Sequence, residues 1–280
     1  MKFIQVGGVM VALLVATAPH IGHSQTADPI FAEFNPANFS NSTTVSNTLF
    51  PLKPGVKLTN EGTAKDAEGD AETLRIEFVT TGLTKVIGGI TTVVVKIDDY
   101  ADGGLVETEL AFFAQDNDGN VWYFGEHPEE YEDGKFLNAK TWLHGIGDSK
   151  AGLYMKAAPA VGDPSVFQGW GPAVEWDDFS RVAEIASEVC VPVSCYKDVV
   201  VMEEGNLSEK GAFQFKSYAP GIGEIRTGWT GEDALQEELV LVELVPLDAD
   251  GLAAVNALAL ELEKHAYEIS EVYKQTEPAK

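Results

Sequence analysis

The sequence predicts a mainly β protein: a single antiparallel meander sheet, curved into a half-barrel or barrel-like shape, with a long C-terminal helix packed on it. Two observations lead to this fold class. Between Gly55 and Val245, short runs of β-branched and aromatic residues alternate with Gly, Asp, Asn and Pro, and no long helical pattern intervenes. From Leu252 onward, the spacing of apolar residues changes to that of a helix.

The N-terminus has the pattern of a secretory signal peptide over residues 1–24. Lys2 precedes an uncharged apolar run at 3–18, which is followed by a short polar stretch with small residues. Because the run is shorter than the roughly 20 apolar residues that span a bilayer, we expect cleavage after Ser24 or Ala27. An uncleaved anchor is the alternative.

The remaining chain predicts one domain with an irregular leader. Residues 25–50 are rich in Asn, Ser, Thr and Pro, which favour loops. Residues 51–247 carry the strand patterns, and residues 248–275 carry the helix. The composition, 45% hydrophobic and 22% charged, is that of a globular protein.

Two hairpins are the clearest local predictions. Gly88-Gly89 lies between β-branched runs, and both positions of a two-residue hairpin turn need positive φ. A second turn, 116–120, joins the runs 107–115 and 121–124. With these, the other strand candidates bring the sheet to roughly ten strands: 74–79, 84–99, 135–142, 173–191, 196–202, 212–218, 223–229 and 238–245.

The C-terminal segment predicts one amphipathic helix that extends to Tyr273. Asp248 or Asp250 can cap its N-terminus. We expect it to cross the sheet of its own domain, and a partner-binding helix is the alternative. Its apolar stripe, with spacings of three and four residues, consists of Leu252, Val255, Ala259, Leu262, Ala266, Ile269 and Tyr273.

The chain is strongly acidic, with 19 Lys and Arg against 44 Asp and Glu and a formal charge of -25. Proteins that bind nucleic acid neutralise phosphates with basic side chains, so we expect no nucleic-acid partner. An anionic membrane surface is disfavoured for the same reason. No apolar run beyond the N-terminal one approaches spanning length, so we expect no membrane span.

The two cysteines of the chain, Cys190 and Cys195, are separated by four residues. In an oxidising compartment this pair predicts a disulfide. Free thiols are the main alternative, because a zinc site would need further ligands and a thioredoxin-like motif has two intervening residues.

Residues 97–134 contain twelve carboxylates and no Lys or Arg. Asp116, Asp118 and Asn120 occupy the first, third and fifth positions of a calcium loop. However, Val121 stands where such a loop needs Gly, and His127 where it needs Glu. A bare turn is therefore the alternative to calcium, and we expect no other cofactor. The charge run itself is typical of a solvated face.

Aromatic residues interleave with these acids and suggest a contact surface. Strand alternation places Trp122 and Phe124 on one face and Tyr123 on the other. One face can fill the core, and the other can present aromatic area beside carboxylates, together with Phe113 and Tyr131. Such a surface suits a small molecule, a glycan or a basic protein. The alternative is that the C-terminal helix covers this face.

No linear motif of an enzyme is present: a nucleophile elbow, a zinc-binding HExxH, a phosphate loop and a dinucleotide fingerprint are all missing. His144 and His265 are interpreted as surface or structural residues. A non-catalytic binding or carrier protein is the leading hypothesis. The alternatives are an extracellular hydrolase or oxidoreductase with a non-linear site, and an acidic surface-interaction module that calcium assists.

Four further motifs stand out: 50–55 (FPLKPG), 114–126 (AQDNDGNVWYFGE), 218–223 (YAPGIG) and 262–268 (LEKHAYE). Together they resemble an uncharacterised family of secreted bacterial proteins over roughly residues 48–275. The resemblance implies a secreted or periplasmic location and a single domain, and it implies no activity. The chain departs from the family at 56–59 and 111–113, where the family tends to have Thr-Trp-Val-Tyr and Asp-Trp-Tyr.

Overall fold

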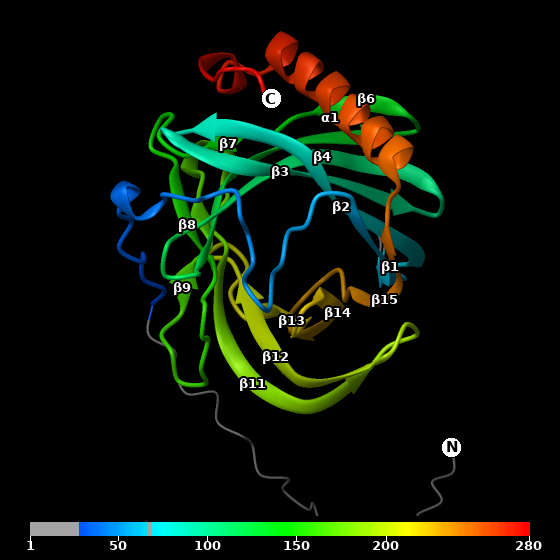
Figure 1. The fold of residues 1–280 in the computed structure, drawn as a ribbon. Coiled ribbons are helices and arrows are strands. Elements are labelled where there is room, and N and C mark those ends of the chain that lie inside the picture. The colour runs from blue at the N-terminus through cyan, green and yellow to red at the C-terminus, as the bar shows by residue number, and fades with distance from the viewer. Residues whose placement is uncertain (1–27, 66–68) are drawn as a thin grey trace, which may run out of the picture.

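A computed structural model describes residues 28–65 and 69–280 of the chain. Its main feature is one antiparallel sheet, which curls through a path of 13 strands until its two ends nearly meet (Figure 1). In this described part of the chain, a single long helix lies on the outside of the sheet. The predicted fold class is confirmed, whereas the predicted signal peptide lies outside the described residues.

Most neighbours in the sheet are also neighbours in the sequence. One half of the path consists of β1 (Val56–Lys65), β2 (Ala71–Ile87), β3 (Ile90–Ala101), β4 (Gly104–Gln115), β5 (Val121–Glu132) and β8 (Lys150–Met155). The other half consists of β15 (Glu238–Pro246), β14 (Gly223–Gly231), β13 (Ala212–Ala219), β12 (Cys195–Gly205) and β11 (Phe179–Cys190). β1 pairs with β15 and joins the halves. The short strands β6 (Lys135–Asn138) and β7 (Trp142–Leu143) pair with β5.

Residues 166–170 contact both edges of the sheet. Within them, β9 (Val166–Phe167) pairs with β11 and β10 (Gly169–Trp170) pairs with β8. Gly152 of β8 permits this approach, because a Cβ there would lie 2.3 Å from the backbone of Gln168. A few residues therefore draw the two ends of the sheet together.

Both predicted hairpins are confirmed. Gly88 and Gly89 have φ values of 56° and 85° and join β2 to β3, with Ile87 opposite Ile90. The 116–120 turn joins β4 to β5.

The leader is mostly irregular, as predicted, with one 3₁₀ turn, η1 (Pro36–Asn38), in its described part. It covers part of the outer face of the sheet. Phe34 and Phe39 pack on Trp122 and Phe124, with ring centroids between 5.4 and 6.1 Å apart. Trp122 and Phe124 are consequently buried.

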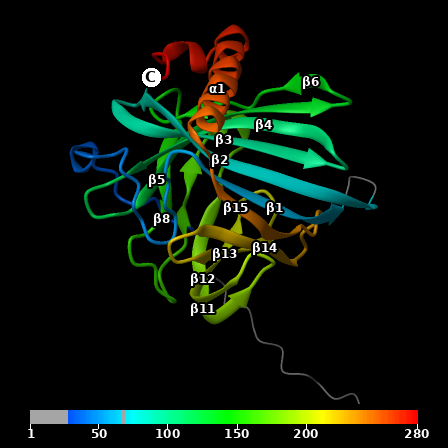
Figure 2. The same ribbon diagram turned by 45° about the vertical axis from the view of Figure 1, so that its right-hand side comes forward.

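The helix α1 (Ala249–Ile269) lies over the outer face of β2 and β4 (Figure 2). Asp248 caps it, since its Oδ1 accepts a hydrogen bond from the Gly251 amide at 2.8 Å. The predicted extension to Tyr273 is wrong: the helix stops at Ile269, and Tyr273 begins a separate turn, η3 (Tyr273–Gln275). Among the described residues, no helix is both long enough and apolar enough to cross a membrane.

A buried ion pair anchors α1 to the sheet. The Lys85 ammonium of β2 donates to Glu263 of α1 at 2.8 Å, to the Tyr267 hydroxyl at 3.0 Å and to the Glu277 carbonyl at 2.6 Å. Tyr273 also donates to Glu263, at 3.2 Å. The helix and the tail that folds back beneath it thus meet at one charged network.

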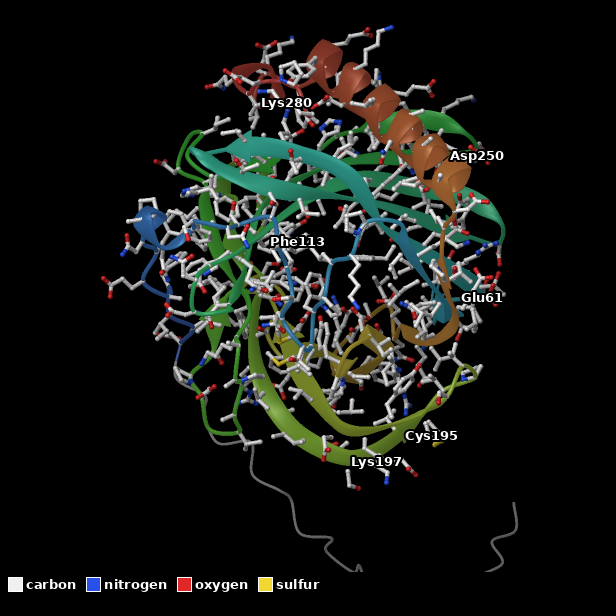
Figure 3. All side chains as sticks on the ribbon, in the orientation of Figure 1. Glu61, Phe113, Cys195, Lys197, Asp250 and Lys280 are labelled. Carbon is white, nitrogen blue, oxygen red and sulfur yellow. A yellow bond between two sulfur atoms is a disulfide. The ribbon has the colours of Figure 1, made fainter. Side chains whose placement is uncertain are left out.

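Cys190 and Cys195 are bonded to each other where β11 turns into β12, which confirms the predicted disulfide (Figure 3 labels Cys195). In the chain-entropy view, a bridge around so short a loop contributes about 2 kcal/mol or less. We expect Cys190→Ser/Cys195→Ser to lower the free energy of unfolding by at most this amount, measured by urea denaturation. Reductant should destabilise the native protein equally and leave the variant unchanged; a variant that fails to fold would contradict this.

We expect Lys85→Met to destabilise the protein by roughly 3–5 kcal/mol, because it leaves the buried Glu263 carboxylate without its counter-charge. The double variant Lys85→Met/Glu263→Gln should recover part of this loss. Urea unfolding of both variants measures it. A loss below about 1 kcal/mol in the single variant would show that the ion pair does not hold the helix.

Candidate functional site

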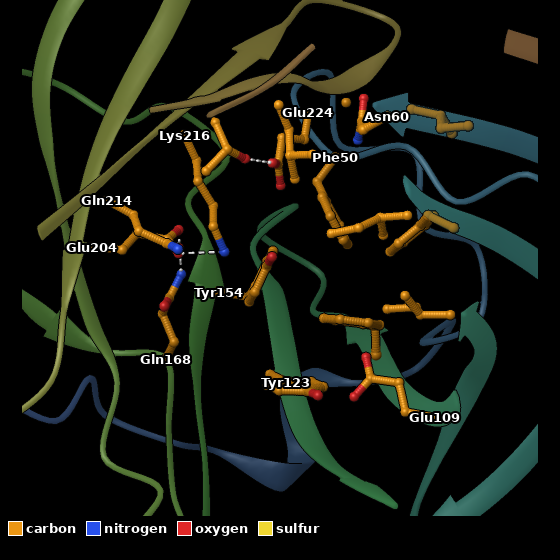
Figure 4. Close-up of a pocket in the computed structure, with 18 of the residues that line it drawn as sticks. Phe50, Asn60, Glu109, Tyr123, Tyr154, Gln168, Glu204, Gln214, Lys216 and Glu224 are labelled. Atoms are coloured by element: carbon orange, nitrogen blue, oxygen red, sulfur yellow. Dashed lines mark hydrogen bonds and ion pairs between the residues drawn. The ribbon is translucent and has the colours of Figure 1, made fainter. Parts of the chain in front are cut away.

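The curled sheet encloses a cavity of about 330 Å³ (Figure 4). Side chains from β1–β5, β8 and β12–β14 line it, together with the start of β15 and residues 50–52. The volume lies at the lower end of the range of small-molecule sites, about 300–1,000 Å³. The cavity is therefore the candidate functional site.

Residues 45–52 pack into the interior of the sheet and form one wall. The Asn47 side chain accepts from the Leu49 and Phe50 amides at 2.9 and 3.1 Å and donates to the Gly119 carbonyl at 2.9 Å. Gln115 accepts from the Asn47 amide at 2.8 Å. These bonds fix the segment, so that Phe50 is held against the cavity.

Aromatic rings form a continuous part of the wall. Phe113 stacks on Tyr123 with centroids 4.6 Å apart, and Tyr154 lies 4.7 Å from Phe50. Trp176 completes the group at 5.6 Å from Tyr123. This surface can contact an apolar group or a cation.

Carboxyl groups supply a further part of the wall, and Lys216 is the one basic side chain among the described residues that line it. The Lys216 ammonium pairs with Glu204 at 2.9 Å. Figure 4 shows Lys216, Gln214 and Glu204 on one side of the cavity and Glu109 on the other. The seven carboxyl-bearing residues of this described wall are Asp99, Glu109, Glu126, Asp178, Glu204, Glu224 and Glu237.

Neutral donors hold several of these carboxyl groups in place. Gln168 donates to Glu204 at 3.0 Å and Gln214 to Glu237 at 2.6 Å. Thr227 donates to Glu224 at 2.6 Å, and the Tyr123 hydroxyl donates to Glu126. These bonds fix the geometry of the wall without supplying a counter-charge.

Burial shifts the proton equilibria of the cavity. Loss of solvent, and then the nearby Glu107, raise the pKa of Asp99 from 3.8 to about 8. Burial likewise raises the pKa of Glu126 to about 8, against the hydrogen bond from Tyr123, and that of Asp178 to about 7, against Lys216. It also raises the pKa of the carboxyl groups of Glu109, Glu224 and Glu237.

Two lining residues carry buried oxygens without a hydrogen bond from any described residue: Asn60 Oδ1 and Asp99 Oδ1. Asn60 is only 7% exposed. An unsatisfied buried polar atom is costly, so these two atoms mark points of the cavity where a hydrogen-bond partner is missing.

The structure brings two of the four predicted binding residues, Phe113 and Tyr123, to the cavity. Trp122 faces the outer layer, and Tyr131 donates to Glu129 at 2.7 Å away from the cavity. Phe113, Trp122 and Tyr123 are all buried. The expected exposed aromatic surface is therefore wrong, because the leader covers one face of β5 and the sheet curls around the other.

The predicted calcium ligands form a self-contained turn. Asp116 accepts from the Asp118 and Asn120 amides at 3.0 and 2.9 Å, and from the Trp122 indole at 2.9 Å. Asp118 accepts from Asn38 at 2.7 Å. These oxygens already receive N–H donors, a geometry that explains the turn without an ion; calcium binding there stays a prediction.

A second polar cluster lies outside the cavity. His127 contacts the Thr141 hydroxyl at 2.6 Å through Nδ1 and Glu129 at 3.1 Å through Nε2, and His265 of α1 also contacts Glu129, at 2.7 Å. Thr141, His127 and Glu129 are thus connected in the order of the nucleophile, base and acid of a catalytic triad. However, Thr141, His127 and Glu129 are 6%, 0% and 1% exposed, so substrate has no access. His144 accepts from the Ala151 amide at 3.0 Å, as expected of a structural residue.

The inward-facing carboxyl groups are not among the predicted site residues, because the sequence pattern favours a solvated face for the acidic run 97–134 and singles out no acid beyond it. One sequence signal pointed to the cavity nonetheless. Three of the four motifs meet there: 50–55 through Phe50, 114–126 through Tyr123 and Glu126, and 218–223 through Ile222. The Gly221 amide also donates to the Thr48 carbonyl at 2.6 Å and holds the first motif in place.

Comparisons with known proteins give a distant likeness only. No protein-family model matches the sequence. No curated protein matches it either. A proposed exported protein with a YmcC-like fold from Bacteroides fragilis NCTC 9343 has 15% identity and a TM-score of 0.43. A proposed lipoprotein from Parabacteroides distasonis ATCC 8503 has 13% identity and a TM-score of 0.37. Each match covers 71% of this chain and 99% of the other, and neither bears on ligand or activity.

We expect the protein to become less stable as pH rises from 4 to 8. In this window the folded state keeps protons on Asp99, Glu126 and Asp178 that the unfolded chain releases near pH 4, so the stabilisation is lost as pH passes the raised pKa values. Thermal unfolding between pH 5 and 8 measures it. Asp99→Asn should make stability depend less on pH, and the exposed control Glu184→Gln should leave the pH dependence unchanged. A melting temperature that rises with pH would contradict the retention of these protons in the folded state.

Proposed function

We propose that this chain is a secreted or periplasmic, non-catalytic binding or carrier protein that encloses a small molecule in its interior cavity. The observation that carries the proposal is the cavity itself: about 330 Å³ of space inside the sheet, with aromatic and polar side chains converging on it. The disulfide between Cys190 and Cys195 is consistent with an extracytoplasmic location.

The arrangement of polar groups favours binding over catalysis. No histidine of residues 28–65 or 69–280 lines the cavity, and the relay-like set of His127, Thr141 and Glu129 is buried elsewhere. The lining carboxyl groups are held by amide and hydroxyl donors, as expected of groups that orient a ligand. Asn60 Oδ1 and Asp99 Oδ1 receive no hydrogen bond from a described residue, which supports a ligand that supplies their partners.

Filling the cavity should abolish binding. We expect native mass spectrometry of protein purified without denaturation from secreting cells to detect a bound small molecule. Ile222→Trp adds an aromatic side chain to the cavity wall and should lower the bound fraction at least tenfold.

The matched control is Ile185→Trp, which places the same ring on β11 at a side chain that is 52% exposed and outside the cavity. It should retain the bound molecule. The proposal fails if the native protein carries nothing and is stabilised by no member of a broad small-molecule library. Turnover that depends on His127 or Glu126 would instead establish an enzyme.

A further inference from the structure

The chemistry missing from the cavity is hydrogen-bond donation. Asn60 Oδ1 is an acceptor, Asp99 Oδ1 becomes one when its carboxyl group loses its proton, and no described residue donates to either of them. Figure 4 shows Asn60 among the side chains that line the cavity. A ligand that satisfies both atoms must itself carry donors, such as the N–H groups of an amine.

The charged groups of the wall also favour a cationic ligand, because acidic side chains outnumber basic ones. Lys216 pairs with Glu204 and lies close enough to Glu224 to interact with it. The charge of Lys216 also acts on Asp99, Glu109, Asp178 and Glu237, so a single ammonium group of the described wall faces seven carboxyl groups. The titratable groups around the cavity are Asp99 on β3, Glu109 on β4, Tyr123 and Glu126 on β5, Tyr154 on β8, Asp178 before β11, Glu204 on β12, Lys216 and the nearby Tyr218 on β13, Glu224 on β14, and Glu237 before β15.

The carboxyl groups are spread over the wall. A metal ion needs several ligand atoms within a few ångströms of one point. The carboxyl groups of the described wall form no such cluster: the one group of three within 4.8 Å in the described part of the chain is Glu188 with Cys190 and Cys195, whose sulfurs are bonded to each other, outside the cavity. A cation that matches the cavity must therefore carry charges at separated positions.

The rest of the wall suits an organic framework. Phe50, Phe113 and Trp176 offer ring faces, and Leu58, Ile97 and Leu239 offer aliphatic surface. Aromatic faces attract ammonium groups and also contact methylene chains.

We propose that the cavity binds a small organic polyamine, whose separated ammonium groups donate to Asp99, Asn60 and the carboxyl groups of the opposite wall while its methylene chain packs on the aromatic rings. The inference rests on the proposed function and names the class of its ligand. A polyamine matches three features of the cavity: two oxygens without hydrogen-bond partners, an excess of separated carboxyl groups, and an apolar lining between them.

Three probes of equal chain length test the charge directly by isothermal titration calorimetry of the full protein: 1,6-diaminohexane, 1,6-hexanediol and hexanedioate. We expect the diamine to bind about tenfold or more tightly than the diol, and hexanedioate not to bind. The diamine should also bind more tightly at pH 8 than at pH 6 and release protons. The reason is that it replaces protons which burial retains on Asp99 and Glu126 in the empty cavity.

Asp99→Asn preserves side-chain shape and removes one charge, so it should weaken diamine binding about tenfold and leave diol binding unchanged. Glu237→Gln should act in the same way, since Glu237 also lines the cavity. Glu184→Gln, an exposed substitution on β11, serves as the matched control and should change neither. Proton release by the native protein tests the proposal independently of any variant.

The two proposals fail in different ways. Equal binding of diol and diamine, or diamine binding without proton release, would overturn the polyamine assignment and leave a neutral ligand in the same cavity. Preferred binding of hexanedioate would overturn it as well. If no probe binds and Ile222→Trp alters no co-purifying molecule, the cavity is not a binding site and both proposals are lost.

Discussion

A sheet that curls through 13 strands encloses more space than its own side chains fill. Barrels of about eight strands are just filled by inward-facing residues, so this larger one must receive additional material. Residues 45–52 supply part of it, and aromatic rings around Phe50 supply more. The space that remains is the cavity. The interior segment, the ring cluster and the candidate site are thus three results of one geometrical constraint.

The same constraint leaves β4 covered on both of its faces. In β4, Leu110 and Phe112 face outward and are buried beneath other chain segments, while Glu109 and Phe113 face the cavity. The outer face is apolar because α1, η3 and the leader cover it. The inner face can hold carboxyl groups because it surrounds a space. The acidity of the chain is therefore partly internal, where burial favours the protonated form of a carboxyl group.

Local chemistry made much of the fold predictable. Gly88-Gly89 and the 116–120 turn fixed two hairpins, and Asp248 marked the start of α1. The candidate site was harder to predict, because strand alternation says which residues share a face and not which face water reaches. Glu109 and Phe113 lie an even number of residues apart and therefore share a face of β4. That this face points into the cavity becomes clear only because α1 and the leader, which are distant in sequence, cover the opposite face.

The end of α1 shows a second limit of periodicity. The apolar stripe continues through Tyr273, but the helix stops at Ile269 because long-range bonds draw the tail back. The Ala279 amide donates to Glu263 at 3.1 Å, and Tyr273 shares that carboxylate. Tyr273 and Ala279 lie 10 and 16 residues from Glu263 in the sequence, and the spacing of apolar residues does not predict such contacts. Spacing correctly marks Tyr273 as a core residue, while its backbone conformation follows from the buried charge.

The pairing of β1 with β15 sets the order in which the chain can fold. Val56 lies opposite Pro246, so most of the described chain lies between two adjacent strands. The hairpins on either side close short loops and can form early, whereas this junction must wait for the last strand and bear the entropy of the largest loop. Until then β1 presents an unpaired edge, which is a template for association between chains. A molecule truncated before β15 would therefore be prone to aggregate even with most of its hairpins intact.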